Sequence, residues 1–347
     1  MGIPITYLRS SMAGTLDMCE LKFLLSYGLG HPEPSNKKTD LGTIVHKVME
    51  VLAKIKLARQ QNKRKIDDEI VGKYSTSPKN FNLDFIVDSI FNYYAKAFSH
   101  QIWDDKDHKT VIKWVNTAIK DYDGKFDPFN QTIVEPERHF SIQLEDDWAK
   151  ELILNGTIDL LIKNDESTYE IVDYKTGKRI NWATREEKTY KYLQNDFQLR
   201  LYHLAASILY PDIEDIFVTI YFMNDGGPFT IPFSKDDLPE TKRQVREVYE
   251  KIKYLDRPKM QSRFHPRDFK SPCKFCSYAK QTFEGTNIKP ILNQGQTKCH
   301  FSKKGEFMTM CEQTHYILDF RDIDVVMEHM SKEGYNIGRY QPPGEVK

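Results

Sequence analysis

Long apolar runs and abundant cysteines are both missing from this sequence. Its apolar stretches fall far short of the roughly 18 residues that cross a bilayer, so no membrane span is expected. The first 25 residues lack a basic segment that leads into an apolar block, which argues against secretion and favours a cytoplasmic location. Five cysteines in an intracellular chain of 347 residues do not indicate disulfides. Clustered ones are better explained as metal ligands or buried thiols.

Excess charge of one sign and a nucleotide-binding loop are also absent. Lys and Arg together number 50, as do Asp and Glu, which excludes a uniformly basic coat for nucleic acid but allows a local basic groove. No Gly-x-x-x-x-Gly-Lys-Ser/Thr loop occurs, so any ATP-driven unwinding of DNA would need a partner. No internal repeat is visible, and the length suits one large domain with an appendage.

The spacing of apolar residues changes from a helical period to a strand period after about residue 125. Helical spacing covers 41–58 and, after a polar loop that ends near residue 82, two helices within 83–123. Beyond residue 125 the predicted elements are strands at 132–144, 154–164 and 168–177, a helix at 188–209, a strand at 215–224 and a helix at 236–255. This order predicts an α/β fold in which helices flank a mixed sheet.

Two carboxylates and a lysine are predicted to converge on one face of this sheet. Asp173 and Lys175 are two residues apart in a strand, so their side chains share a face, and Asp159 reaches them across the hairpin. Such a group suits Mg²⁺ or Mn²⁺, with the lysine placed to orient water or a phosphate. Taken alone, Asp-x-Lys is more often a solvated ion pair on an edge strand.

The flanking residues point to a known family. Gly156-Thr157-Ile158-Asp159, Ile171-Val172-Asp173-Tyr174-Lys175, Gln198-x-x-x-Tyr202 and the upstream Leu41-Gly42-Thr43-x-x-His46 occur in that family's order. This pattern resembles the PD-(D/E)XK nuclease superfamily. Its nearest branch is the RecB-like one, which includes the AddB nuclease domain and the CRISPR adaptation nucleases. The resemblance implies a restriction-endonuclease-like core.

The resemblance also implies a role for each motif residue. His46, Asp159, Asp173 and the backbone carbonyl of Tyr174 would bind the divalent metal. Lys175 would orient the attacking water, and Gln198 and Tyr202 would complete the site near the phosphate. Glu135 or Glu137, on the preceding strand, could add an acidic group; the sequence does not choose between them, and surface charge is an equal alternative.

Three cysteines resemble the ligands of iron–sulfur members of this branch. Cys19, Cys273 and Cys276 match three of the four positions, whereas Thr282 stands at the fourth. Thiolates suit a 4Fe-4S cluster or zinc. The missing ligand could come from Cys299 or Cys311, or a zinc site could combine Cys273 and Cys276 with Cys299, His300, Cys311 or His315. A lost cluster with leftover buried cysteines is the alternative.

The predicted domain organisation places one nuclease domain at 1–284, with a helical part at 1–125, a catalytic core at 126–256 and a Cys-rich basic region at 257–284. Cations and aromatics interleave in that basic region, as in surfaces that bind phosphates and stack bases, although a solvated loop explains them too. Residues 285–347 form an appendage of unknown role that resembles no family.

The sequence therefore predicts a metal-dependent DNA nuclease. An exonuclease that acts on single strands or duplex ends is favoured, in recombination, phage or CRISPR-type DNA processing and with a helicase or recombination protein as a possible partner. The alternatives are a non-catalytic DNA-binding or scaffolding subunit with the same fold, and a structure- or sequence-specific endonuclease.

Overall fold

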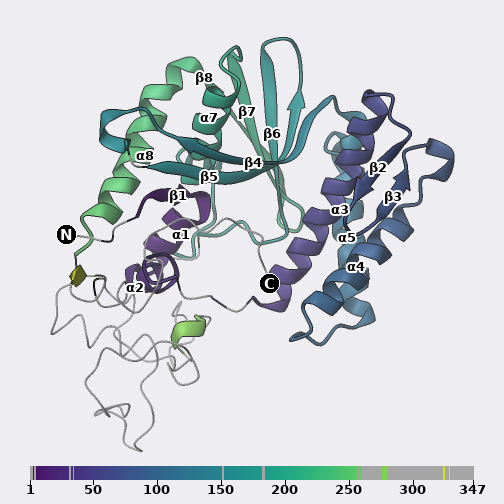
Figure 1. Cartoon of the computed structure of the whole chain (residues 1–347), viewed down its shortest axis with the longest axis horizontal. Helices are drawn as coiled ribbons and strands as arrows, with labels where there is room; N and C mark the ends of the chain where they lie inside the picture. The colour runs from purple at the N-terminus through teal and green to yellow at the C-terminus, as the bar shows by residue number, and fades with distance from the viewer. Residues whose placement is uncertain are drawn as a thin grey trace, which may run out of the picture.

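A mixed β-sheet with helices on both faces organises the chain (Figure 1). The computed structural model describes residues 3, 5–30, 33, 35–150, 152–181, 184–256, 258, 276–279, 323–324 and 328. Within these ranges the sheet has six strands: β1 (Tyr7–Arg9), β4 (Ile133–Gln143), β5 (Ile153–Lys163), β6 (Thr168–Lys175), β7 (Asp215–Phe222) and β8 (Gly227–Ser234). The predicted α/β fold with a mixed sheet flanked by helices is confirmed.

The central strand β5 has three partners, and their registers leave a fork in the sheet. Strand β4 runs antiparallel along one edge of β5. On the other edge, β6 pairs only with residues 160–163 and β1 only with residues 153–155. Between these two ladders, residues 156–159 of β5 have no strand partner on that edge. Because β6 continues alongside β7 as far as Lys175, β5 and β6 separate where the predicted motifs lie.

The two faces of the sheet carry separate hydrophobic clusters. One face packs against α1 (Ser10–Met18), α2 (Glu20–Phe23), α6 (Tyr190–Leu193), α7 (Phe197–Leu209) and α8 (Leu238–Lys253). The other face packs against α3 (Lys37–Gln60), α4 (Leu83–Ala97) and α5 (Asp105–Lys120). Figure 1 shows these two groups of helices on opposite sides of the strands. Apolar residues alternate along β6, with Ile171 in the first cluster and Val172 and Tyr174 in the second.

The first third of the chain is less helical than its spacing predicts. Strand β1 joins the main sheet, and the predicted loop before residue 82 contains a hairpin of β2 (Lys65–Asp68) and β3 (Gly72–Ser75). Both predictions were wrong for a local reason. Strand β1 has three residues, too few to show a period, and β2 and β3 are rich in charge. The hairpin is held instead by Asp68, whose carboxylate accepts the backbone N–H of Ile70 at 3.0 Å and pairs with Lys47 at 3.1 Å.

Two elements in the second half also differ from expectation. The helix predicted at 188–209 is interrupted between α6 and α7, where Asp196 caps α7 by accepting the backbone N–H of Gln198 at 3.0 Å. Strand β8 was not predicted, because Pro228 and Pro232 lie within it. Its only strand partner among the described residues is β7, and an edge strand tolerates proline because outward-facing N–H groups need no partner.

The predicted domain limits concern a part of the chain that is mostly outside the described residues. Tyr278 and Ile323 are described, and both are buried in the cluster on the α1 and α7 face. The boundary at residue 284 stays a prediction. Among the described helices, none combines the length and the apolar character needed to span a membrane.

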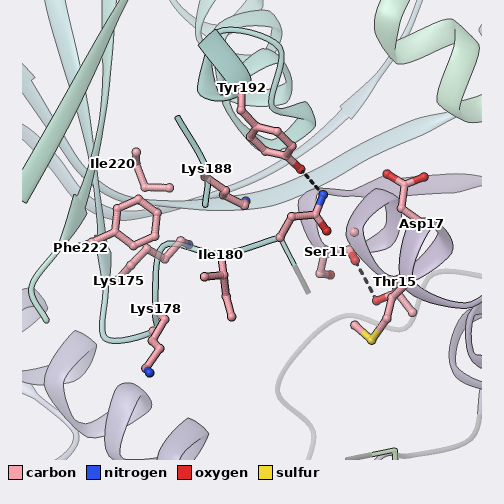
Figure 2. A pocket seen from close by; sticks show the side chains of 14 residues that line it. Ser11, Thr15, Asp17, Lys175, Lys178, Ile180, Lys188, Tyr192, Ile220 and Phe222 are labelled. Carbon is pink, nitrogen blue, oxygen red and sulfur yellow. Dashed lines mark hydrogen bonds between the residues drawn. The ribbon is translucent and has the colours of Figure 1, made fainter. Parts of the chain in front are cut away.

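A pocket of about 330 Å³ opens beside the carboxyl end of β6. Figure 2 shows its two walls, which are α1 on one side and β7 with the segment after β6 on the other. Lys175 lies at its edge, so the pocket adjoins the fork between β5 and β6.

Candidate active site

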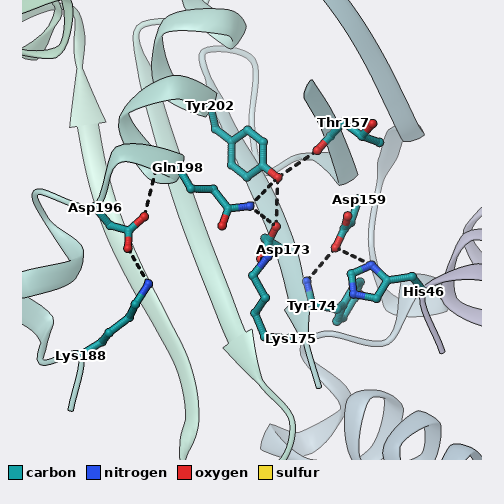
Figure 3. A network of polar contacts seen from close by, with 10 residues as sticks. All are labelled: His46, Thr157, Asp159, Asp173, Tyr174, Lys175, Lys188, Asp196, Gln198 and Tyr202. Carbon is teal, nitrogen blue, oxygen red and sulfur yellow. Dashed lines mark hydrogen bonds and ion pairs between the residues drawn. The ribbon is translucent and has the colours of Figure 1, made fainter. Parts of the chain in front are cut away.

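The fork between β5 and β6 brings Asp159, His46 and the backbone of Tyr174 together (Figure 3). Asp159 Oδ2 lies 3.1 Å from His46 Nδ1 and accepts the N–H of Tyr174 at 2.9 Å. That N–H lies beyond the last β5–β6 pair, Leu160 and Val172, so the carboxylate takes the place of a strand partner. The Tyr174 side chain points to the other face, where its hydroxyl donates to the Phe126 carbonyl at 2.9 Å. Only its main chain can serve the site.

A close approach of α3 to the end of β6 places His46. A Cβ on Gly42 would lie 2.8 Å from the Thr176 hydroxyl, so a larger residue would force the Thr176 side chain or the helix to shift. Residue 46 follows one helical turn after residue 42 and therefore faces the same strand end. The glycine and the histidine of this motif thus serve one purpose, which is to place an imidazole from a helix against a carboxylate from the sheet.

Asp173 and Lys175 share a face of β6 and form an ion pair, with Lys175 Nζ 2.6 Å from Asp173 Oδ2. Asp173 is buried, whereas the lysine side chain keeps 30% of its surface exposed. The carboxylate is therefore fixed inside the protein and the ammonium stands at the boundary with solvent. This is the geometry that the two-residue spacing predicts for a strand.

Gln198 and Tyr202 lie one turn apart on α7 and hold the second oxygen of Asp173. Gln198 Nε2 donates to Asp173 Oδ1 at 2.9 Å and lies 2.8 Å from the Tyr202 hydroxyl oxygen. The Tyr202 hydroxyl can donate its proton to Asp173 Oδ1 at 3.0 Å or to the Thr157 carbonyl at 2.9 Å. That carbonyl belongs to the unpaired edge of β5, so α7 closes the fork with side chains where no strand does.

The structure distinguishes the two acids that the sequence left open. Pairs on either side, Pro136 with Leu160 and Arg138 with Ile158, place Glu137 opposite Asp159. Glu137 has a φ of 47°, which non-glycine residues rarely adopt, and its carboxyl group interacts with the charges of Asp159 and His46. Glu135 pairs instead with Arg138 at 2.9 Å and accepts from the Tyr210 hydroxyl at 3.2 Å. Glu137 is therefore the acid beside the fork.

Burial and mutual charge set the protonation of the group. Burial is the main reason that the pKa of Asp173 is raised; the Lys175 ammonium opposes this rise and the Asp159 carboxylate adds to it. Burial acts on Asp159 too, but His46 and Lys175 hold its pKa below the usual range. Burial would lower the pKa of Lys175, yet Asp173 and Asp159 raise it, so the lysine stays an ammonium. Burial, followed by repulsion from Asp159, raises the pKa of Glu137 to about 7.

The donors at the fork fit a hard divalent ion in their chemistry. Among the described residues, no three His, Cys, Asp or Glu side chains stand as a ready-made metal cluster. The acids Asp159, Asp173 and Glu137 nevertheless lie close enough to His46 to interact with its charge, and the raised pKa of Glu137 reflects burial first and then repulsion from Asp159, which a cation would offset. Carboxylate and imidazole ligands suit Mg²⁺ or Mn²⁺, which nucleases of the PD-(D/E)XK type generally use.

The predicted cysteine and basic regions are described only in small part. Cys19 is buried, and its sulfur accepts the backbone N–H of Lys22 at 3.4 Å at the start of α2. Cys276 packs against the hydrophobic cluster on the α1 and α7 face, to which Cys19 also belongs. The hydroxyl oxygens of Tyr278 and Ser26 lie 3.3 Å apart. Cys273, Thr282, Cys299 and Cys311 lie outside the described residues, as does most of the basic stretch 257–280.

A comparison with protein-family models agrees with the motifs at this site. A family model described as the PD-(D/E)XK nuclease superfamily matches residues 11–281, which is well over half of the chain. No curated protein matches the sequence. A solved structure from Eubacterium rectale, named "Putative exonuclease", aligns with a TM-score of 0.41 at 13% identity, over 71% of this chain and 80% of that one. Because the family model spans the fork and every motif around it, the chain belongs to the PD-(D/E)XK nuclease superfamily.

Proposed function

We propose that this chain is a divalent-metal-dependent deoxyribonuclease of the RecB-like branch that hydrolyses DNA from its ends. The observation that carries the proposal is the fork, where one strand pair and two helices hold the pair Asp159–His46 and the pair Asp173–Lys175 close enough for the charges of each pair to act on the other. The motifs around it resemble those of the RecB-like nucleases, and the order of the motifs is the same.

The metal would be held by His46, Asp159 and Asp173, with Glu137 beside them, and would polarise the phosphate and lower the pKa of a bound water. The residues of the chain do the positioning. Gln198 and Tyr202 fix Asp173 through Oδ1, which leaves Oδ2 directed towards Lys175. The Lys175 ammonium, charged at neutral pH, can hold the attacking water or stabilise negative charge on the phosphate.

Exonuclease action predicts a strict need for DNA ends. Covalently closed circular DNA should survive conditions under which the same DNA, linearised, is degraded with Mg²⁺ or Mn²⁺ present. Gel electrophoresis of both forms over time measures this, and nicked circles report whether single-strand breaks suffice. Rapid cutting of closed duplex circles would establish the endonuclease alternative. Absence of any cleavage would favour the non-catalytic DNA-binding subunit.

We also propose that Cys19, Cys273 and Cys276 share an iron–sulfur cluster or zinc that joins the two ends of the nuclease domain. Support comes from Tyr278 and Cys276, which pack beside the α2 region that begins at Cys19. Protein purified without oxygen should be brown, absorb near ~400 nm and contain iron, or be colourless with stoichiometric zinc. Protein that contains neither metal would defeat this assignment and leave Thr282 as the mark of a lost cluster.

A further inference from the structure

The pocket beside Lys175 combines cations with an apolar wall (Figure 2). Lys175, Lys178 and Lys188 line it against a single carboxylate, Asp17. Lys188 pairs with Asp196 at 2.8 Å and Asp17 pairs with Lys251 at 2.9 Å. Lys178 is exposed and, within the described part of the chain, makes no ion pair. An anionic ligand would therefore find a positive charge that is not neutralised by an ion pair with any described residue.

The apolar part of the lining suits a flat ring. Ile180, Ile220 and Phe222 form one wall, and the Tyr192 ring stands across from them with 38% of its surface exposed. Asn181 Nδ2 donates to the Tyr192 hydroxyl at 3.1 Å, which holds the ring in place. Tyrosine rings of this kind stack on nucleobases without regard to sequence.

The size of the pocket limits what it can hold. Its volume of about 330 Å³ is at the lower end of the range for small-ligand sites. One nucleotide fits such a space, whereas a base pair within a duplex does not. The pocket also adjoins the lysine that meets the scissile phosphate, so a nucleotide inside it could be bonded to that phosphate.

We infer that this pocket binds a single unpaired nucleotide, the one attached to the scissile phosphate at the end of a DNA strand. Its base would lie against Tyr192 and the apolar wall, and Lys178 would bind its outer phosphate. The inference rests on the proposed nuclease function and specifies its substrate as a strand end that is single-stranded over at least one nucleotide.

Gly14 offers a way to block the pocket without disturbing the fold. It lies in the middle of α1 and lines the pocket, and a Cβ built on it meets no atom within 4 Å. Gly14→Trp should therefore fill the pocket while α1 stays intact. Gly14→Ala is the matched control, because it makes the same backbone change and adds one methyl group. Circular dichroism melts should show both variants folded.

The test measures binding and cleavage separately. In EDTA, where no metal supports hydrolysis, wild type and Gly14→Ala should bind dAMP and dTMP by calorimetry, and Gly14→Trp should not. A linear single-stranded oligonucleotide should compete for that binding, and a single-stranded circle should not. With Mg²⁺, Gly14→Trp should slow degradation of linear DNA by about tenfold or more. Lys178→Gln should raise KM, whereas Lys73→Gln, a change of an exposed lysine on the β2–β3 hairpin, should not.

The outcomes separate the two proposals. If wild type degrades linear DNA but binds neither monophosphate, or if folded Gly14→Trp behaves as wild type, the pocket assignment is overturned and the nuclease function stands. If circles compete as well as linear strands, the pocket does not require an end and the inference is overturned. If monophosphates bind in a Gly14-dependent way but no DNA is cleaved, the pocket assignment is supported and the proposed function fails.

Discussion

Replacing Asp173 by alanine should reduce DNA cleavage on the order of 10³-fold or more while the protein stays folded. The Asp173 carboxylate contacts Lys175, Gln198 and Tyr202, so its loss removes both a proposed metal ligand and the ion-pair partner of the lysine. Most DNA binding should remain, because phosphate contacts elsewhere are untouched. Initial rates on end-labelled linear DNA and fluorescence anisotropy in EDTA measure the two effects.

The stability of the same variant is an independent check. Burial and repulsion from Asp159 raise the pKa of Asp173, so the charged carboxylate costs folding free energy at neutral pH. Without metal, the melting temperature of Asp173→Ala should therefore equal or exceed that of wild type. Asp147→Ala, a change of an exposed aspartate, is the matched control for activity. Near-normal Mg²⁺-dependent cleavage by Asp173→Ala would remove this residue from the site.

Acid should destabilise the protein through His203, which lies outside the site. This side chain is buried between α7 and the sheet, stacks on Phe233 with ring centroids 4.7 Å apart, and lies 2.9 Å from the Thr241 hydroxyl. Burial lowers its pKa to about 4, whereas the unfolded chain keeps an ordinary value near ~6.5. Below pH ~6.5 the unfolded chain therefore takes up a proton on His203 that the folded protein does not readily bind. The penalty therefore grows as pH falls and reaches about 3 kcal/mol near pH ~4.

The comparison that isolates this effect is between wild type and His203→Gln. Glu137 acts in the opposite direction. Because its pKa is raised in the folded protein, Glu137 stabilises the fold most at low pH, and this stabilisation is lost as the pH rises through about 7. The pH dependence of wild-type stability alone therefore combines the effects of His203 and Glu137. Between pH ~7 and pH ~5, urea unfolding should show wild type losing about 2 kcal/mol relative to His203→Gln. A difference that does not change with pH would mean that His203 takes up a proton in the folded protein.

The strands that carry the site were predictable, because their residues alternate and their charged members lie two apart. The same alternation could not reveal the fork. The separation of β5 from β6 depends on β1, which has three residues, and on Gln198 and Tyr202 reaching in from α7. These are long-range contacts that leave no local pattern.

The orientation of Glu137 was hidden for a related reason. A regular strand would put residues 135 and 137 on one face, but the strand has a positive φ at Glu137, which neighbours Asp159 and His46, whereas Glu135 contacts Arg138 and Tyr210. The start of α7 at Asp196, in contrast, could have been predicted from the sequence, because an aspartate directly before an apolar helical run is a preferred N-cap. The unbroken helical spacing on both sides concealed it.

If the acids and the lysine at the fork carry out metal-dependent hydrolysis of DNA, cleavage must depend on added metal and begin at DNA ends. The most direct measurement is incubation of end-labelled linear DNA, single- and double-stranded, with the purified protein, with Mg²⁺ or Mn²⁺ titrated into EDTA-treated samples. We expect no cleavage in EDTA and progressive loss of label from the ends as either metal is added. Cleavage that persists undiminished in EDTA, or none with either metal on any of these substrates, would contradict it.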